Sequence, residues 1–181
     1  MKPALLLALL LPVAAAAQSN RGGRTGQPMP GGMSGFGAPS TPQQIVAPDV
    51  PVLEGLPHAV RVGYTVYVSA MVPLDSTGRL VGPGDLTAQT RQVLANLGAV
   101  MRAAKGVPGD VVRATVYARD LTPDKVLLIR KEVLDQLDHA SPPALTIVGV
   151  SGFAEPGIEV EIEATGQLRG DYPDRSRMGK P

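Results

Sequence analysis

The sequence has no cysteine and no tryptophan among its 181 residues, and it has only four tyrosines and two phenylalanines. Without cysteine the chain can form no disulfide and no thiolate metal site, so its stability must come from packing or assembly. The shortage of aromatic rings predicts an aliphatic core. The formal charge of +1 lacks the basic excess typical of nucleic-acid-binding domains, and we therefore expect no nucleic-acid partner.

Metal and hydrolase motifs are also missing from the sequence. The two histidines, His58 and His139, stand far apart without a ligand spacing, and no serine, histidine and aspartate motif is present. We therefore expect neither a metal site nor a cofactor.

The first 17 residues have the pattern of a cleavable export signal. In "MKPALLLALLLPVAAAAQ", Lys2 precedes an apolar run at 4–13, and alanines at 15–17 form a small-residue cleavage motif. The apolar run is shorter than the roughly 20 residues that span a bilayer, so we expect no stable membrane anchor after cleavage. The mature protein is predicted to be secreted or periplasmic.

Composition divides the remaining chain into three segments. Residues 18–52 are rich in glycine and proline and poor in large apolar side chains, which predicts a disordered linker. Residues 169–181 are again polar and predict a flexible tail. Residues 53–168 carry the periodic patterns of a folded domain.

Two periods alternate along that domain. Alternating patterns predict strands in "AVRVGYTVYVSAMVPL", where Gly63 lies in a turn between two strands, in "DVVRATVYARDL", at 144–151 and in "GIEVEIEATG". Helical spacing predicts one helix that begins after the N-cap Asp85 and a second over 122–137. The order ββαβαββ predicts an α+β fold, a two-layer sandwich with a mixed sheet and two helices on one face.

Strand alternation also assigns side chains to the two faces of the sheet. The predicted core face carries Val66, Val68, Ala70, Val72, Val112, Ala114, Val116 and Ala118. The opposite face, called the open face below, carries Tyr67, Arg113, Thr115, Tyr117, Arg119, Glu159, Glu161 and Glu163. We expect Leu145 and Ile147 to lie beside the open face, and such exposed apolar side chains predict a surface between subunits.

Three blocks of the sequence follow one another in a characteristic order and spacing: "HAVRVGYTVYVSAMVPLDSTGRLVGPGDLTAQTRQVLANLGAVMRAA", "DVVRATVYARDL" and "GIEVEIEAT". In this order and spacing they resemble the RidA family, also called YjgF or L-PSP. The resemblance implies a chorismate-mutase-like fold and a homotrimer with ligand clefts between subunits. It also implies hydrolysis of imines and enamines derived from amino acids to keto acids and ammonia.

The same resemblance points to a missing residue. The family's enzymes bind the substrate carboxylate with an arginine in a block such as "PARTTVGV", and here the block reads "PPALTIVGV", with Leu145 at that position. A guanidinium makes two charge-assisted bonds to a carboxylate and leucine makes none. Glu161 matches the family's cleft glutamate, which helps to position water.

The other predicted cleft positions are mostly apolar. Leu56 stands where many members have Tyr or Phe, Ala70 and Met71 replace a glycine and a polar residue, and His58 could donate to a ligand or be a neutral surface histidine. The predicted ligand cleft comprises Leu56, His58, Ala70, Met71, Tyr117, Leu145 and Ile147.

Two interpretations of function remain open. The first is an exported homotrimer that binds a small molecule between subunits and has lost most imine deaminase activity. The second is an active deaminase whose carboxylate clamp comes from elsewhere, for example Arg61 or Arg119.

Overall fold

The computed structural model describes residues 41–53, 55–138 and 140–169. The predicted export signal, the first part of the predicted linker, His139 and the predicted tail from 170 onward lie outside these residues. None of the described helices is both long and apolar enough to cross a membrane.

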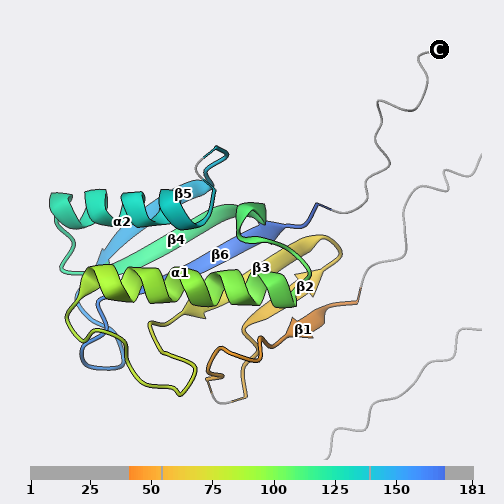
Figure 1. Cartoon of the computed structure of the whole chain (residues 1–181), viewed down its shortest axis with the longest axis horizontal. Coiled ribbons are helices and arrows are strands. Elements are labelled where there is room, and N and C mark those ends of the chain that lie inside the picture. The colour runs from red at the N-terminus through yellow and green to blue at the C-terminus, as the bar shows by residue number, and fades with distance from the viewer. Residues whose placement is uncertain (1–40, 54, 139, 170–181) are drawn as a thin grey trace, which may run out of the picture. The chain divides into compact units, whose positions relative to one another are not determined.

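The domain is one mixed sheet with two helices packed on the same face (Figure 1). The strands run in the order β1-β2-β3-β6-β4-β5, and only the β4–β5 pair is parallel. The elements are β1 (Gln43–Ile45), β2 (Ala59–Val62), β3 (Thr65–Met71), α1 (Leu86–Ala103), the 3-10 turn η1 (Pro108–Asp110), β4 (Val111–Arg119), α2 (Pro123–Gln136), β5 (Ala144–Val150) and β6 (Val160–Gln167). This architecture confirms the predicted α+β fold and adds one strand to it.

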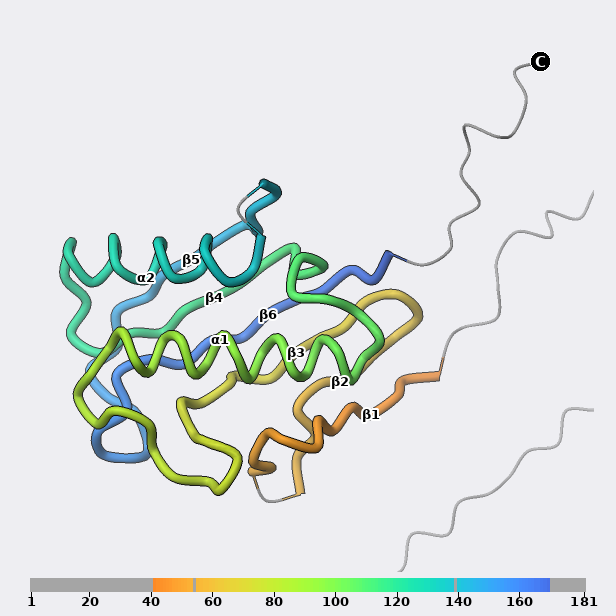
Figure 2. Tube along the Cα trace, in the orientation of Figure 1, coloured from red at the N-terminus to blue at the C-terminus, as the bar shows by residue number. Residues whose placement is uncertain are grey.

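The additional strand lies inside the predicted linker, so the prediction of a disordered segment up to residue 52 is wrong for its last part. Gln43 pairs with Arg61 and Ile45 pairs with Ala59, which makes β1 an edge strand beside β2 (Figure 2). Ala47 and Val50 follow it and are buried. The average composition of residues 18–52 did not reveal this strand, because its few apolar residues stand among many prolines and glycines.

The first residue of the predicted tail is also fixed to the domain. Arg169 Nε lies 3.0 Å from Asp110 Oδ1, and its guanidinium donates to the carbonyl of Gly109 over 3.1 Å. The folded domain therefore extends beyond both predicted boundaries.

Two β-bulges shift the core pattern from the predicted phase. The β3–β6 register shifts between Val68 and Met71, so Met71 is buried and Ala70 and Val72 are only half-buried. In β4 the register shifts between Val111 and Arg113; Val111 is buried and Val112 is 49% exposed. Strict alternation predicts that Ala70, Val72 and Val112 are buried and that Met71 and Val111 are not. The structure differs because a bulge inserts one extra residue, so the side chains beyond it point to the opposite face.

The two helices begin where the sequence predicts. Asp85 Oδ1 accepts from the Ala88 amide over 3.0 Å at the start of α1, and Thr122 Oγ1 accepts from the Lys125 amide over 3.4 Å at the start of α2. Each side-chain oxygen satisfies an amide that has no partner within its helix.

Candidate functional site

The predicted cleft residues fall in three separate places. Leu56, His58, Ala70 and Met71 line one hollow, called the loop hollow, beside the segment 50–57. Tyr117 and Glu161 pair across β4 and β6 on the open face. Leu145 and Ile147 lie on β5. Within a single chain, the seven predicted cleft positions therefore do not form one cleft.

The loop hollow is small and mostly apolar in a single chain. Its volume is about 20 Å³, which is room for roughly one water molecule. Leu56 at its rim is largely exposed and Met71 at its base is buried. The hollow can receive a larger group only if its walls move or a second surface extends it.

His58 is neither a surface histidine nor available to donate to a ligand. Its ring is 4% exposed. Nδ1 accepts from the amide of Ala47 over 3.0 Å, and Nε2 lies 3.0 Å from the carbonyl of Pro51. Because a carbonyl can only accept, the geometry selects the neutral tautomer with the proton on Nε2. His58 therefore fixes the segment that forms one wall of the loop hollow.

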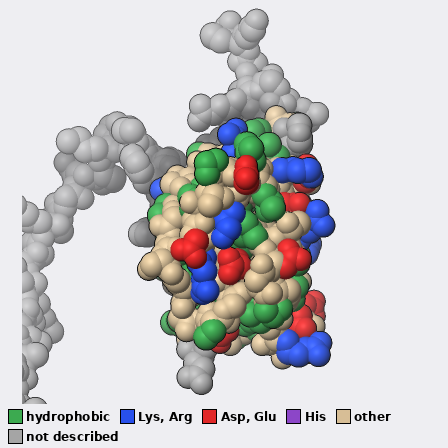
Figure 3. Space-filling view, turned by 90° about the vertical axis from the view of Figure 1, so that its left-hand side faces the viewer, with side chains coloured by type: hydrophobic (Ala, Val, Ile, Leu, Met, Phe, Trp, Pro, Cys, Tyr) green, Lys and Arg blue, Asp and Glu red, His purple; other side chains and the backbone are tan. Residues whose placement is uncertain are grey.

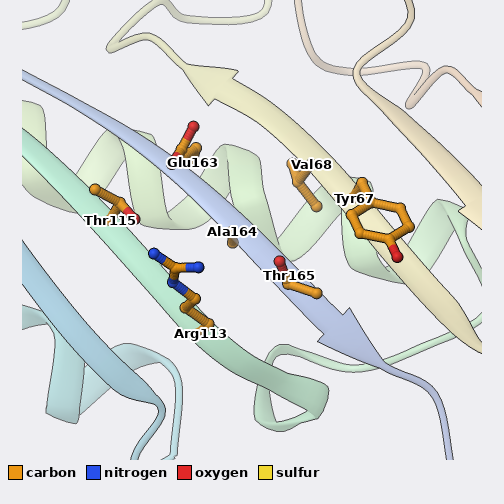
Figure 4. Close-up of a pocket in the computed structure, with 7 residues that line it drawn as sticks. All are labelled: Tyr67, Val68, Arg113, Thr115, Glu163, Ala164 and Thr165. Carbon is orange, nitrogen blue, oxygen red and sulfur yellow. The ribbon is translucent and has the colours of Figure 1, made fainter.

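The open face carries a broad polar depression (Figure 4). Its volume is about 340 Å³, and its polar lining comes from Tyr67, Arg113, Thr115, Glu163 and Thr165. In Figure 4 these side chains lie on the side of β3, β6 and β4 that faces away from α1. Tyr67 is 55% exposed and Val148, on the same face of β5, is also exposed, so an apolar and charged surface lies uncovered in the single chain.

Burial changes the proton affinity of two groups on the open face. The half-buried Glu161 loses hydration, which raises the pKa of its carboxyl above the ordinary value of 4.5. Burial also raises the pKa of Tyr117, with smaller contributions from the charge and hydrogen bond of Glu163. Glu161 can therefore hold a proton at a higher pH than an exposed glutamate, which suits a group that exchanges protons with a ligand or water.

The three glutamates of this segment have different surroundings. Glu159 lies 3.4 Å from Lys125 Nζ, which also donates to the carbonyl of Arg119 over 2.8 Å. Among the described residues, Glu161 forms no ion pair. Glu163 forms no ion pair among these residues either, and its hydrogen bond is with Tyr117. Glu161 therefore remains available on the open face, and its role stays a prediction.

The prediction that Leu145 and Ile147 lie beside the open face is wrong. Leu145 pairs with Ala114 and Ile147 with Val116, and both partners are buried under the helices. Leu145 and Ile147 are half-buried and pack against the core. Because both faces of β5 carry apolar residues, its alternation alone cannot determine which face points inward.

This register places Leu145 and Glu161 on opposite faces of the same sheet. A single chain therefore cannot bring both side chains to one small ligand. A site that uses both positions needs a second copy of the chain.

Of the two alternative clamp residues, Arg61 is occupied. Its Nε donates to the carbonyl of Gly63 over 2.8 Å and a terminal nitrogen donates to the carbonyl of Ala104 over 3.2 Å. Arg119 lies on the open face at the end of β4, and its buried Nε has no hydrogen-bond partner among the described residues. Arg119 therefore remains able to bind an anion.

Arg130 lies beside Leu145 and was not among the site residues predicted from the sequence. A hollow of about 210 Å³ between α2 and β5, called the helix hollow, is lined by Arg130, Val133, Leu134, Pro142, Pro143 and Leu145. The spacing of Arg130, Val133 and Leu134 is i, i+3 and i+4, which places them on neighbouring positions of the helix surface. That spacing was visible in the sequence, but the partner strand was not.

The described residues contain no group of three or more His, Cys, Asp and Glu side chains arranged to hold a metal ion.

Charges of both signs are interspersed with apolar side chains on the side of the domain seen in Figure 3.

Known proteins resemble this chain in sequence and in fold. The family described as Endoribonuclease L-PSP matches residues 49–167. A 2-iminobutanoate/2-iminopropanoate deaminase of Escherichia coli is 32% identical over 108 residues, which are 59% of this chain and 82% of that protein. The mouse (Mus musculus) protein of the same name is 36% identical over 108 residues, 59% of this chain and 76% of its own length.

The fold agrees with a solved structure of the same group. The crystal structure of RidA from the Antarctic bacterium Psychrobacter sp. superposes with a TM-score of 0.63 at 31% identity, covering 70% of this chain and 99% of that chain. These relatives support a RidA-type function. With its described fold and a family match over residues 49–167, this chain belongs to the Endoribonuclease L-PSP family, which is the family of RidA and YjgF.

Proposed function

We propose that this chain is an exported, trimeric RidA-type protein that binds a small molecule in clefts between subunits and hydrolyses imines weakly or not at all. The observation that carries the proposal is leucine at position 145, where the resemblance places a carboxylate-binding arginine. Breaking a buried arginine–carboxylate pair costs on the order of 3 to 5 kcal/mol. We therefore expect turnover at least about 100-fold below that of a relative with the arginine.

The opposite placement of Leu145 and Glu161 supports the trimer part of the proposal, because a shared site needs two copies. The exposed Tyr67 and Val148 on the open face give a second copy an apolar surface to cover. Sedimentation velocity at micromolar concentration should give three times the mass of one mature chain. A monomer under these conditions would contradict the proposed assembly.

Export is supported by Lys2, the short apolar run and the alanines at 15–17. The intact mass of protein recovered from the periplasmic or outer fraction should correspond to a chain that begins at Gln18. Recovery of uncleaved chain from the cytoplasm would contradict export.

The weak-activity part is tested with imines of alanine or 2-aminobutyrate, generated in place by an amino-acid oxidase and followed with semicarbazide as the competing trap. The wild type should hydrolyse them slowly, and Leu145→Arg should raise the rate if the cleft keeps the family geometry. Glu161→Ala in the Leu145→Arg background should remove the gain. A wild-type rate equal to that of an arginine-containing relative would contradict the proposal.

An active deaminase is the second candidate, and two observations favour it. Glu161 is half-buried, unpaired among the described residues and has a raised pKa, and Arg119 has a buried Nε without a partner. Fast wild-type hydrolysis that falls in both Glu161→Ala and Arg119→Leu would support this candidate in place of the first.

The family name Endoribonuclease L-PSP suggests action on nucleic acid, and the charges of the open face bear on that suggestion. The open face carries Arg113 and Arg119 together with Glu161 and Glu163. A mixed surface of this kind differs from the continuous basic stripe that binds phosphates, and the absence of a nucleic-acid partner stays a prediction.

A further inference from the structure

The helix hollow combines apolar walls with one guanidinium. Val133 of α2 is buried, Pro143 just before β5 is buried, and Leu145 of β5 is half-buried. Arg130 is exposed and lines the same hollow. Because prolines have no backbone N–H, Pro142 and Pro143 offer no donor, and the strong hydrogen-bond donor of the lining is the guanidinium.

Arg130 differs from Arg91, Lys125 and Lys131 of the two helices, although Arg102 in the last turn of α1 also has no ion pair in the part of the chain that the structure describes. Arg91 binds Glu132 through two bonds of 2.9 Å, Lys131 pairs with Asp135, and Lys125 contacts Glu159. Within the described residues, Arg130 forms no ion pair or hydrogen bond. The positions three and four residues away are Val126, Leu127, Val133 and Leu134, so α2 itself supplies no carboxylate.

We propose that the helix hollow is a binding site for a small aliphatic carboxylate and that Arg130 binds its carboxylate group. The inference rests on the proposed function and names the ligand class and the residue that one chain contributes to recognise it. Arg130 lies on the helix side of the sheet and Glu161 lies on the open face, so a carboxylate bound by Arg130 within one chain is kept away from Glu161, in keeping with weak hydrolysis.

The size and chemistry of the helix hollow fit this class of ligand. The volume of the helix hollow, about 210 Å³, is many times the space that one water needs. A four-carbon oxo acid is small enough for a hollow of this size. The planar fork of one arginine matches one carboxylate in a bidentate arrangement, whereas a phosphate dianion calls for further donors that the lining does not offer. The aliphatic part of the ligand would lie against Leu134, Pro143 and Leu145.

The test measures binding of two probes to the full mature chain by calorimetric titration. The probes are 2-oxobutanoate and its uncharged analogue 2-oxobutanamide. Wild type should bind the carboxylate at least about 10-fold more tightly than the amide, because a hydrogen bond to a charged group contributes most of the difference. Arg130→Leu should weaken carboxylate binding about 10- to 100-fold and leave amide binding unchanged.

Three further variants make the result specific. Lys131→Leu removes the same charge one residue away and should change the Kd less than about 2-fold. Arg130→Lys should recover only part of the affinity, because an ammonium cannot form the bidentate pair. Arg130→Leu combined with Leu145→Arg should restore carboxylate binding by moving the cation to the opposite wall of the same hollow.

The outcomes separate this inference from the proposed function. Two results would overturn the assignment of Arg130: no carboxylate binding by the wild type, or equal carboxylate binding by the wild type and Arg130→Leu when circular dichroism shows both proteins folded. Either result would leave the proposal of weak deaminase activity standing. Fast imine hydrolysis by the wild type overturns the proposed function, while the Kd pattern of the variants still decides the role of Arg130.

Discussion

The two helices pack on the same face of the sheet and differ in how they do so. Helix α1 has 18 residues and buries ten of them, whereas α2 has 14 residues and buries only Ile129, Glu132 and Val133. Helix α1 crosses the middle of the sheet, and α2 lies over its β4–β5 edge (Figure 1). The comparison indicates that α1 provides most of the buried framework, whereas α2 is less buried and leaves the helix hollow beside β5.

Gln89 on α1 connects parts of the chain through buried hydrogen bonds of its side chain. It is fully buried, its Nε2 donates to the carbonyls of Gly82 and Gly157 over 3.0 and 2.7 Å, and its Oε1 accepts from the Glu159 amide over 2.7 Å. One side chain thus connects the loop before α1 with the loop before β6. No side chain of α2 among the described residues makes three such connections.

The largest expected effect is therefore in α1. Gln89→Leu keeps a similar volume but removes three hydrogen bonds. It leaves the Glu159 amide without its partner, while the carbonyls of Gly82 and Gly157 keep their backbone bonds from Asp85 and Gly84. At about 1 to 3 kcal/mol for the unsatisfied amide and about 1 kcal/mol for each other lost bond, the free energy of unfolding should fall by about 2 kcal/mol or more. Urea denaturation followed by circular dichroism measures it. Gln44→Leu, at an exposed position of β1, is the matched control, and an equal loss in the two variants would break the distinction between framework and surface.

A medium effect is expected where the helices meet. Arg91 on α1 binds Glu132 on α2, and this hydrogen bond, together with its charge, holds the pKa of the buried Glu132 carboxyl below its ordinary value of 4.5. A lowered folded-state pKa contributes stability that is fully present above the unfolded-state value and is lost as pH falls through the folded-state value.

Arg91→Met should therefore reduce stability most at pH 7, and the difference from wild type should shrink as pH falls below about 4.5. Without Arg91, burial would raise the pKa of Glu132 and favour its protonated form. Urea midpoints at pH 7 and pH 4 measure the change. Lys131→Met removes an exposed ion pair with Asp135 and should show little pH dependence. A difference between Arg91→Met and wild type that is the same at both pH values would exclude this coupling.

The sequence predicted the features of the fold that depend on local chemistry, and it did not predict those that depend on pairing between strands. The helix starts at Asp85 and Thr122 and the β2–β3 turn at Gly63 follow local chemistry, and Gly63 indeed has a φ of +60°. The phase of Ala70 and Val112 was wrong because bulges depend on pairing with another strand. Leu145 was assigned to the wrong face because only its register with Ala114 decides the face.

The same distinction between local signals and distant contacts applies to the residues of the candidate site. Glu161 was selected from one strand and a resemblance, and four of the seven predicted cleft positions, Leu56, His58, Ala70 and Met71, line the loop hollow. The role of His58 was missed because its partners, the Ala47 amide and the Pro51 carbonyl, are backbone atoms of a segment predicted to be disordered. Arg130 was missed because its significance depends on a strand 15 residues further along the chain.

The smallest expected effect on stability is at Arg130, although its effect on binding should be large. Its exposed guanidinium has no partner among the described residues, so Arg130→Leu leaves no buried group unsatisfied and replaces one good helix former with another. The free energy of unfolding in the absence of ligand should change by less than about 0.5 kcal/mol. Thermal or urea unfolding of Arg130→Leu beside Gln89→Leu measures this contrast in one series. A loss from Arg130→Leu as large as that from Gln89→Leu would show that α2 belongs to the framework, and the distinction between the two helices would then have to be abandoned.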